Sequence, residues 1–166
     1  MHQNRRLPSV YLKPGEIYIG TRPTIVTTVL GSCVSVVFFS ARRRLGGICH
    51  ALMPGGGLDE EGCRYVDFSI RHMLEEFRRQ QVAAFEIEVK LFGGADMFSC
   101  TTPNGTIGQQ NIRRALSIIE AEKLNLVASD VGGESSRKLM FFVHSGEVLM
   151  KRHKSRQEPS PEPIRQ

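Results

Sequence analysis

Cys33 and His50 are the residues of this chain whose types and spacing indicate chemistry. Cys33 follows Gly31 and Ser32 between two short apolar runs, and His50 lies on the next apolar run. An imidazolium beside a cysteine lowers the pKa of the thiol, which supplies a thiolate nucleophile near neutral pH, and can later protonate a leaving group. The pair therefore favours acyl transfer through a thiol.

Two strands are predicted around Cys33. Residues 24–30 and 34–39 are rich in β-branched and aromatic side chains and are too short for helices. Between them, Gly31 permits a sharp backbone change, where the N–H groups of Ser32 and Cys33 can converge as an oxyanion hole.

A β-hairpin is predicted to bring His50 to Cys33. The apolar run resumes at 45–53 after the polar segment 40–44, and a turn centred near residues 41–42 places the two residues opposite each other. A register shifted by two positions keeps both on one face, because side chains alternate with period two. Directly opposite β-carbons lie about 5 Å apart. A strand cysteine is nevertheless more often a small core residue and a strand histidine more often structural, so spacing alone leaves both interpretations open.

Five segments together resemble one known family in order and spacing: LGSCVSVVFF, LGGICHALMP, KLFGGADMF, IGQQNIRRAL and DVGGESSRKLMFFVHSGEVLMKR. The family is CheD, the chemoreceptor glutamine deamidases, and the resemblance covers about residues 16–152. It implies an α+β fold with α/β/β layers, related to the catalytic fold of the cytotoxic necrotizing factors.

By that resemblance, Cys33 is the catalytic cysteine, His50 the catalytic histidine and Thr27 the threonine that completes a triad. The implied reaction hydrolyses side-chain amides of glutamines on the cytoplasmic helices of methyl-accepting chemoreceptors, giving glutamate and ammonia. Methyl-glutamate esters are implied as further substrates, and a CheC-type phosphatase as a partner. Asp96 is an alternative partner for His50, but the resemblance gives that role to Thr27.

One domain is expected over residues 1–153, followed by a charged, proline-rich, disordered tail over 154–166. No apolar run approaches the roughly 20 residues that cross a bilayer, and the N-terminus has no apolar core of a signal peptide. We therefore expect a cytoplasmic protein without membrane insertion.

Neither a metal nor a cofactor is expected. The four cysteines, at positions 33, 49, 63 and 100, form no Cys-x-x-Cys motif and are expected to be reduced. Cys49 adjoins His50 on a strand, so the two side chains point to opposite faces and Cys49 is expected in the core.

The formal net charge of +5 favours acidic partners. The arginine pairs fall on separate predicted elements without a stacking platform, which argues against a nucleic-acid module. The turn at Arg42–Arg44 lies at the hairpin tip far from Cys33, where it is a candidate contact for an acidic protein.

The remaining elements complete a layered domain. Residues 1–15 are expected to be a loosely structured arm, and Gly55, Gly56 and Gly57 either a substrate loop or a connector. Asp67 is predicted to cap a helix that buries Ile70, Met73, Leu74 and Phe77, and a second helix is predicted to bury Ile112, Ala115, Leu116 and Ile119. Further strands are predicted at 17–19, at 85–91, from 126, at 139–143 and at 148–150.

A rival interpretation is a non-catalytic adaptor that binds receptor helices or a phosphatase. It predicts a broad exposed apolar patch and indifference to substitution of Cys33.

Overall fold

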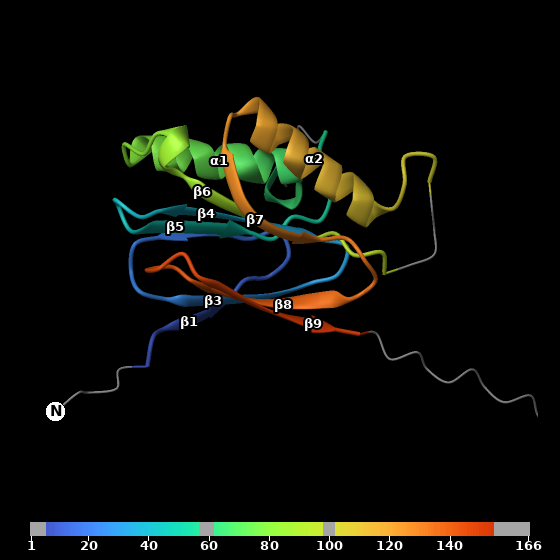
Figure 1. Cartoon of the computed structure of the whole chain (residues 1–166), viewed down its shortest axis with the longest axis horizontal. Helices are drawn as coiled ribbons and strands as arrows, with labels where there is room; N and C mark the ends of the chain where they lie inside the picture. The colour runs from blue at the N-terminus through green and yellow to red at the C-terminus, as the bar shows by residue number, and fades with distance from the viewer. Residues whose placement is uncertain (1–5, 57–61, 98–101, 155–166) are drawn as a thin grey trace, which may run out of the picture.

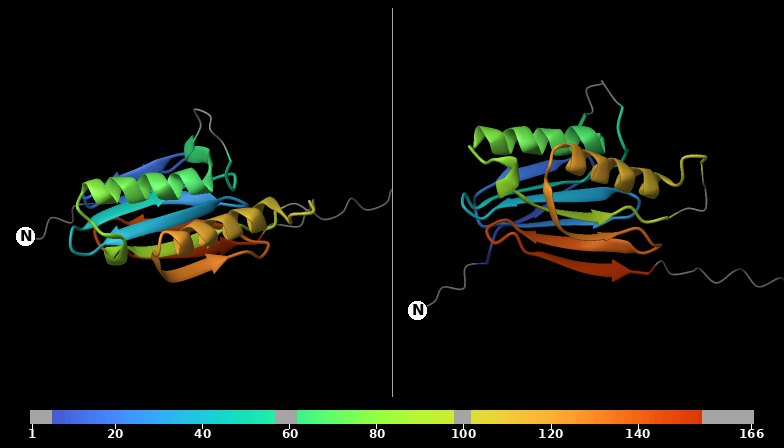
Figure 2. Two further views of the ribbon diagram at one scale, coloured as in Figure 1. Left: turned by 90° about the horizontal axis from the view of Figure 1, so that it is seen from above. Right: turned by 45° about the horizontal axis from the view of Figure 1, so that its top comes forward.

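The computed structural model describes residues 6–56, 62–97 and 102–154 and shows three layers (Figure 1). Two helices lie on one face of a five-stranded sheet, and a four-stranded sheet lies against its other face. Both helices cover the same face, as the two views in Figure 2 show. The predicted α+β fold with α/β/β layers is therefore confirmed. The domain boundary at 153 remains a prediction, because residues 155–166 lie outside the described part.

The strands divide between the two sheets in an order that differs from chain order. The four-stranded sheet has the order β1 (Ser9–Tyr11), β3 (Ile25–Leu30), β8 (Ser136–Phe142), β9 (Val148–His153). The five-stranded sheet has the order β2 (Ile17–Gly20), β5 (Leu45–Cys49), β4 (Val34–Ser40), β6 (Glu88–Gly93), β7 (Asn125–Val131). The helices are α1 (Val66–Arg79) and α2 (Ile107–Ala121), with short 3-10 turns η1 (Gly62–Arg64) and η2 (Ala84–Glu86).

Strand β4 is buried along its whole length, because helices cover one face of its sheet and the second sheet covers the other. Phe38 belongs to the core on the helix side, where its ring meets Phe77 of α1 edge to face. Val37 points the other way, into the core between the sheets. The predicted apolar stripe of α1 is confirmed, since Ile70, Met73, Leu74 and Phe77 are all buried.

Two helix predictions need correction. Tyr65, not Asp67, is the N-cap residue of α1, and the Asp67 carboxylate accepts a hydrogen bond from the Phe68 N–H within the first turn. On α2, Leu116 is 41% exposed and Asn111 is buried instead, because the face that packs on the sheet is set by the close approach of the helix around Gly108.

The strand predicted from residue 85 begins at Glu88. Residues 84–86 form η2, and Phe85 is 83% exposed. Alternation of Ile87, Val89 and Leu91 located the buried face of β6, but extending the pattern to Phe85 was wrong.

The N-terminal segment is more ordered than predicted. Strand β1 pairs in parallel with β3, and the Leu12 N–H donates to the Thr27 carbonyl. The Leu12 side chain is buried between the sheets. The prediction of a loose arm is therefore wrong for residues 9–12.

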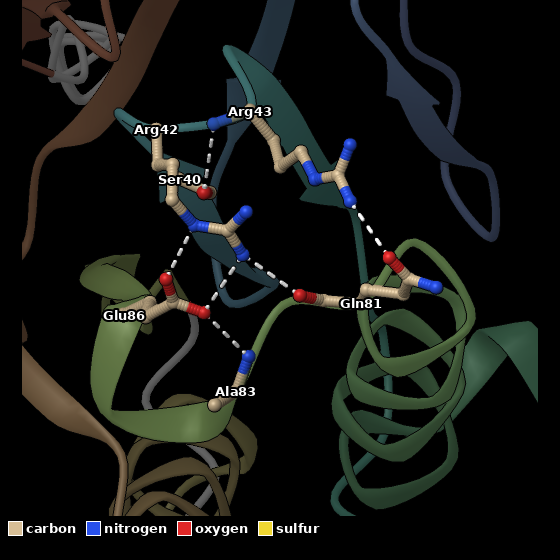
Figure 3. A network of polar contacts seen from close by, with 6 residues as sticks. All are labelled: Ser40, Arg42, Arg43, Gln81, Ala83 and Glu86. Carbon is tan, nitrogen blue, oxygen red and sulfur yellow. Dashed lines mark hydrogen bonds and ion pairs between the residues drawn. The ribbon is translucent and has the colours of Figure 1, made fainter.

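The hairpin tip between β4 and β5 is attached to the rest of the chain by side-chain hydrogen bonds (Figure 3). The Arg42 guanidinium donates to both carboxylate oxygens of Glu86, at 2.6 and 3.1 Å, and to the Gln81 carbonyl. Hydrogen bonding by the Arg42 guanidinium lowers the pKa of the Glu86 carboxyl to about 2. Arg43 donates to the side-chain oxygen of Gln81. Two of the three arginines proposed to meet an acidic protein are thus engaged with the molecule itself.

Within the described ranges, no helix combines the length and apolar character needed to cross a membrane.

Candidate active site

Cys33 lies where the chain passes from one sheet to the other. Strand β3 belongs to the four-stranded sheet and β4 to the five-stranded sheet, so Gly31 to Cys33 form the crossover. The Cys33 side chain is partly exposed and packs against the core between the sheets. The predicted strands on either side of the Gly-Ser-Cys segment are confirmed.

Every carbonyl of this crossover accepts a hydrogen bond from the scaffold. The donors are Ala95 N to Gly31 O (3.0 Å), Asn111 Nδ2 to Ser32 O (3.0 Å) and Gly94 N to Cys33 O (2.9 Å). In a trans peptide the C=O and the following N–H point in opposite directions, so the N–H groups of Ser32 and Cys33 face away from these donors. Within the described residues, neither N–H donates to a backbone acceptor. The oxyanion hole suggested for these two N–H groups remains a prediction.

Gly93 makes the close packing of the crossover possible. Its φ is +106°, and a β-carbon there would lie 2.2 Å from the Cys33 carbonyl oxygen. A glycine at this position therefore lets the two backbones approach closely.

The β4–β5 register places His50 on the same face as Cys33. Val37 pairs with Ile48 and Val34 with Ala51, and the same register sets Cys33 opposite Leu52. The turn comprises residues 41–44, so the pairing is shifted by two positions from the predicted one. Because the shift is even, His50 and Cys33 stay on the same face, toward the second sheet, but as diagonal neighbours instead of directly opposite residues. Cys49 points to the helix-side core, as predicted.

The His50 backbone is fixed by the segment before β2. Its N–H donates to Glu16 O at 3.1 Å, and its carbonyl accepts from Gly15 N at 2.8 Å. The side chain is buried, with 3% of the residue exposed.

Thr28 determines the proton position on the His50 ring. The Thr28 Oγ1 lies 2.7 Å from His50 Nδ1 and 2.8 Å from the Leu12 carbonyl oxygen. A carbonyl oxygen only accepts, so the single hydroxyl proton goes to Leu12 and the Thr28 oxygen accepts from Nδ1–H. The lone pair of the neutral ring is then on Nε2, which can act as a base.

The structure gives Thr28 the place that the resemblance assigned to Thr27. Val26, Thr28 and Leu30 are buried toward the space between the sheets, and Thr27 is turned to the opposite face of β3. Sequence spacing does not separate two adjacent threonines. Leu12 was missed altogether, because its carbonyl meets Thr28 through a contact between separate segments that no local pattern records.

Burial shapes the electrostatics of the pair. It raises the pKa of the Cys33 thiol, an effect partly offset by the residue's own N–H. It also lowers the pKa of His50 to about 4. Both groups are therefore neutral near pH 7, which differs from the thiolate and imidazolium expected from the sequence.

Asp96 forms its hydrogen bonds with residues other than His50. Its carboxylate accepts a hydrogen bond from the Thr106 hydroxyl at the start of α2, and its N–H donates to Gly133 O. Thr106 is the N-cap of α2, so Asp96 supports the helix end that carries Asn111.

The glycine segment after β5 is partly described. Gly55 packs closely on the Asp67 carboxylate, and Gly56 has a φ of +99° with open space around it. Gly57 lies outside the described residues, as does Cys100. A substrate loop at Gly55–Gly57 remains a prediction.

The described cysteines, Cys33, Cys49 and Cys63, are free thiols. Burial raises the pKa of Cys49 to about 12, so this thiol is unreactive near neutral pH. The described residues contain no cluster of three or more His, Cys, Asp or Glu side chains that could hold a metal ion.

Comparison with known proteins places the chain among the layered α+β proteins and then in one family. The solved structure of the Bacillus licheniformis hypothetical protein YfiH matches with a TM-score of 0.51 at 14% identity, over 69% of this chain and 50% of that one. This likeness concerns the fold. The family model for CheD chemotactic sensory transduction matches residues 53–152. The chain belongs to the CheD family.

Two relatives extend the match to most of the chain. The probable chemoreceptor glutamine deamidase CheD 2 of Geobacter sulfurreducens is 50% identical over 147 residues, covering 89% of this chain and 91% of its own. The probable chemoreceptor glutamine deamidase CheD of Maridesulfovibrio salexigens is 44% identical over 164 residues, covering 92% and 96%.

Proposed function

We propose that this protein hydrolyses the side-chain amides of selected glutamines on chemoreceptors to glutamate and ammonia, with Cys33 as nucleophile and His50 as base. The observation that carries the proposal is the hydrogen-bond chain from Leu12 through Thr28 to His50, which leaves Nε2 unprotonated on the face that carries Cys33. The names of the relatives supply the substrate class.

Acylation begins with neutral groups. As the Cys33 sulfur bonds to the glutamine Cδ, its proton passes to His50 Nε2, and the carbonyl oxygen becomes an oxyanion facing the N–H groups of Ser32 and Cys33. The intermediate then collapses: His50 returns the proton to the amide nitrogen, the C–N bond breaks and ammonia leaves. A thioester remains on Cys33.

Deacylation repeats the sequence with water. Water gives a proton to Nε2 as its oxygen attacks the thioester, the C–S bond breaks, and the thiol regains the proton. Thr28 holds the ring with Nδ1–H toward its own oxygen throughout both half-reactions, which orients Nε2 and stabilises the transient imidazolium with a neutral group.

Methyl-glutamate esters fit the same steps, with methanol leaving in place of ammonia. Either reaction yields one carboxylate, so the product is a more negative receptor surface. Binding of a CheC-type phosphatase remains a prediction, and so does a cytoplasmic location.

The test is mass spectrometry of a receptor cytoplasmic fragment incubated with wild-type protein, with Cys33→Ser and with Cys63→Ser as a matched cysteine control. Wild type and Cys63→Ser should convert glutamine to glutamate, with the gain of about one dalton that replacement of NH2 by OH produces, and Cys33→Ser should not. Binding of the fragment without conversion by wild type would favour the adaptor instead.

A further inference from the structure

Asn111 of α2 is a fully buried polar residue that contacts the two segments carrying Cys33 and His50. Its Nδ2 donates to Ser32 O and to Leu52 O, each at 3.0 Å. Ser32 precedes the nucleophile, and Leu52 is opposite Cys33 in the β4–β5 register. One amide group thus ties the crossover to the segment after β5 that contains His50.

The position is costly to occupy with a polar side chain. The Asn111 Oδ1 is buried and has no hydrogen-bond partner among the described residues. A buried unpaired acceptor is destabilising, so packing alone does not account for an asparagine here. Both N–H groups of the Asn111 amide, by contrast, donate to backbone carbonyls of the candidate site.

Gly108, one turn earlier on the same face of α2, allows the helix to come this close. A β-carbon at Gly108 would lie 2.4 Å from Gly94 O and 2.6 Å from Ala95 O. Gly94 and Ala95 are the residues whose N–H groups hold the other two crossover carbonyls. Among the described contacts, Asn111 supplies the side-chain donor in an otherwise backbone cradle.

We propose that Asn111 is a positioning residue that aims the Cys33 N–H at the oxyanion formed during acylation. The Ser32 carbonyl and the Cys33 N–H belong to one trans peptide, so fixing the carbonyl toward α2 fixes the N–H in the opposite direction. Asn111 touches neither substrate nor the reacting atoms. The proposal rests on the thiol mechanism proposed above.

Two reactions of Cys33 separate this role from general support of the fold. Iodoacetamide alkylates the thiolate: sulfur bonds to the CH2 carbon, iodide leaves, and no oxyanion forms. p-Nitrophenyl acetate acylates it: sulfur bonds to the carbonyl carbon, the carbonyl oxygen passes through an oxyanion, and p-nitrophenolate leaves with the C–O electron pair. The ratio of the two rates reports oxyanion stabilisation.

The experiment compares wild type with Asn111→Leu, which has similar volume and no donor, and with Asn111→Ala. Ile118→Ala is the matched control, a buried residue of the same helix without a described contact to the crossover. Acylation should fall by roughly 10²-fold in both Asn111 variants, the effect of a lost oxyanion donor, while alkylation changes less than about 3-fold. The control should keep the wild-type ratio.

Proportional loss of both rates, unchanged rates, or failure of both Asn111 variants to fold would overturn the positioning role and leave the proposed function standing. Absence of Cys33 acylation in the wild type, with alkylation intact, would overturn the thiol mechanism and this role with it.

Discussion

At the scale of single residues, the tautomer of His50 is set through two hydrogen bonds by the backbone carbonyl of Leu12. Because the Thr28 hydroxyl donates to Leu12 O, its oxygen must accept from Nδ1–H, and the lone pair of the ring is left on Nε2, the proposed base. In the proposed mechanism, an uncharged hydroxyl and a carbonyl thus perform the orienting task that a carboxylate performs in many other triads.

Replacing the Thr28 hydroxyl tests this chain of contacts. Thr28→Val keeps the shape but leaves His50 Nδ1–H and Leu12 O unpaired, so kcat for deamidation should fall by roughly 10²-fold, within the range of general-base catalysis. Thr27→Val is the matched control on the opposite face of β3 and should change kcat less than about 3-fold. A larger loss in the Thr27 variant would return the role to Thr27.

The neutral resting state makes a prediction about pH. Burial raises the pKa of Cys33 above its ordinary value of 9.0 and lowers that of His50 to about 4, so little thiolate exists between pH 5 and about 8. The rate of Cys33 alkylation by iodoacetamide should therefore keep rising through pH 9. A plateau of fast alkylation near pH 6, as for a thiolate paired with imidazolium, would contradict the neutral pair.

At the scale of elements, the sequence predicted the hairpin and the common face of Cys33 and His50 because side-chain alternation survives an even shift of register. It did not predict which threonine meets His50, because Ile25, Val26, Val29 and Leu30 supply apolar residues to both faces of β3. Leu12 and Asn111 were missed for another reason. Each acts through contacts between segments far apart in the chain, which no local pattern records.

Gly93 links β6 to the crossover, and its substitution tests that contact. In Gly93→Ala the new β-carbon would meet the Cys33 carbonyl at 2.2 Å, so the variant should lose both stability and deamidase activity. Gly133→Ala also has a positive φ, of +72°, but nothing within 4 Å of its β-carbon. This control should cost about 1 kcal/mol of unfolding free energy, by backbone strain alone, and keep its activity. If Gly93→Ala and Gly133→Ala lost thermal stability and turnover to the same extent, the result would argue against the close contact at Cys33.

At the scale of the whole molecule, a buried arginine joins the two sheets. Arg137 of β8 donates to the Asp130 carboxylate of β7 at 2.8 Å and to Gly132 O at 2.7 Å. The Arg137 side chain is 3% exposed, whereas Arg152 of β9, which also pairs with Asp130, is 58% exposed. Because Gly132 N donates to Gly93 O, this junction also supports the strand end behind Cys33.

Matched substitutions of the two arginines test the junction. Arg137→Met should lower the free energy of unfolding by about 2 kcal/mol, since it removes charge-assisted hydrogen bonds that a buried guanidinium donates to Asp130 and to Gly132 O. Arg152→Met should cost less than about 1 kcal/mol, as for exposed ion pairs. Urea unfolding at neutral pH measures both, and equal small effects would show that the junction contributes little to holding the sheets together.

The proposed reaction passes through a covalent intermediate on Cys33, which is detected most directly from the mass of the Cys33 peptide after acid quench of a reaction with a receptor fragment. In the wild type, Cys33 should carry a thioester that hydroxylamine releases, and Cys33→Ser should show neither this adduct nor glutamate formation. Glutamate formation at full rate in Cys33→Ser, with no adduct on Cys33 in the wild type at any time, would contradict it.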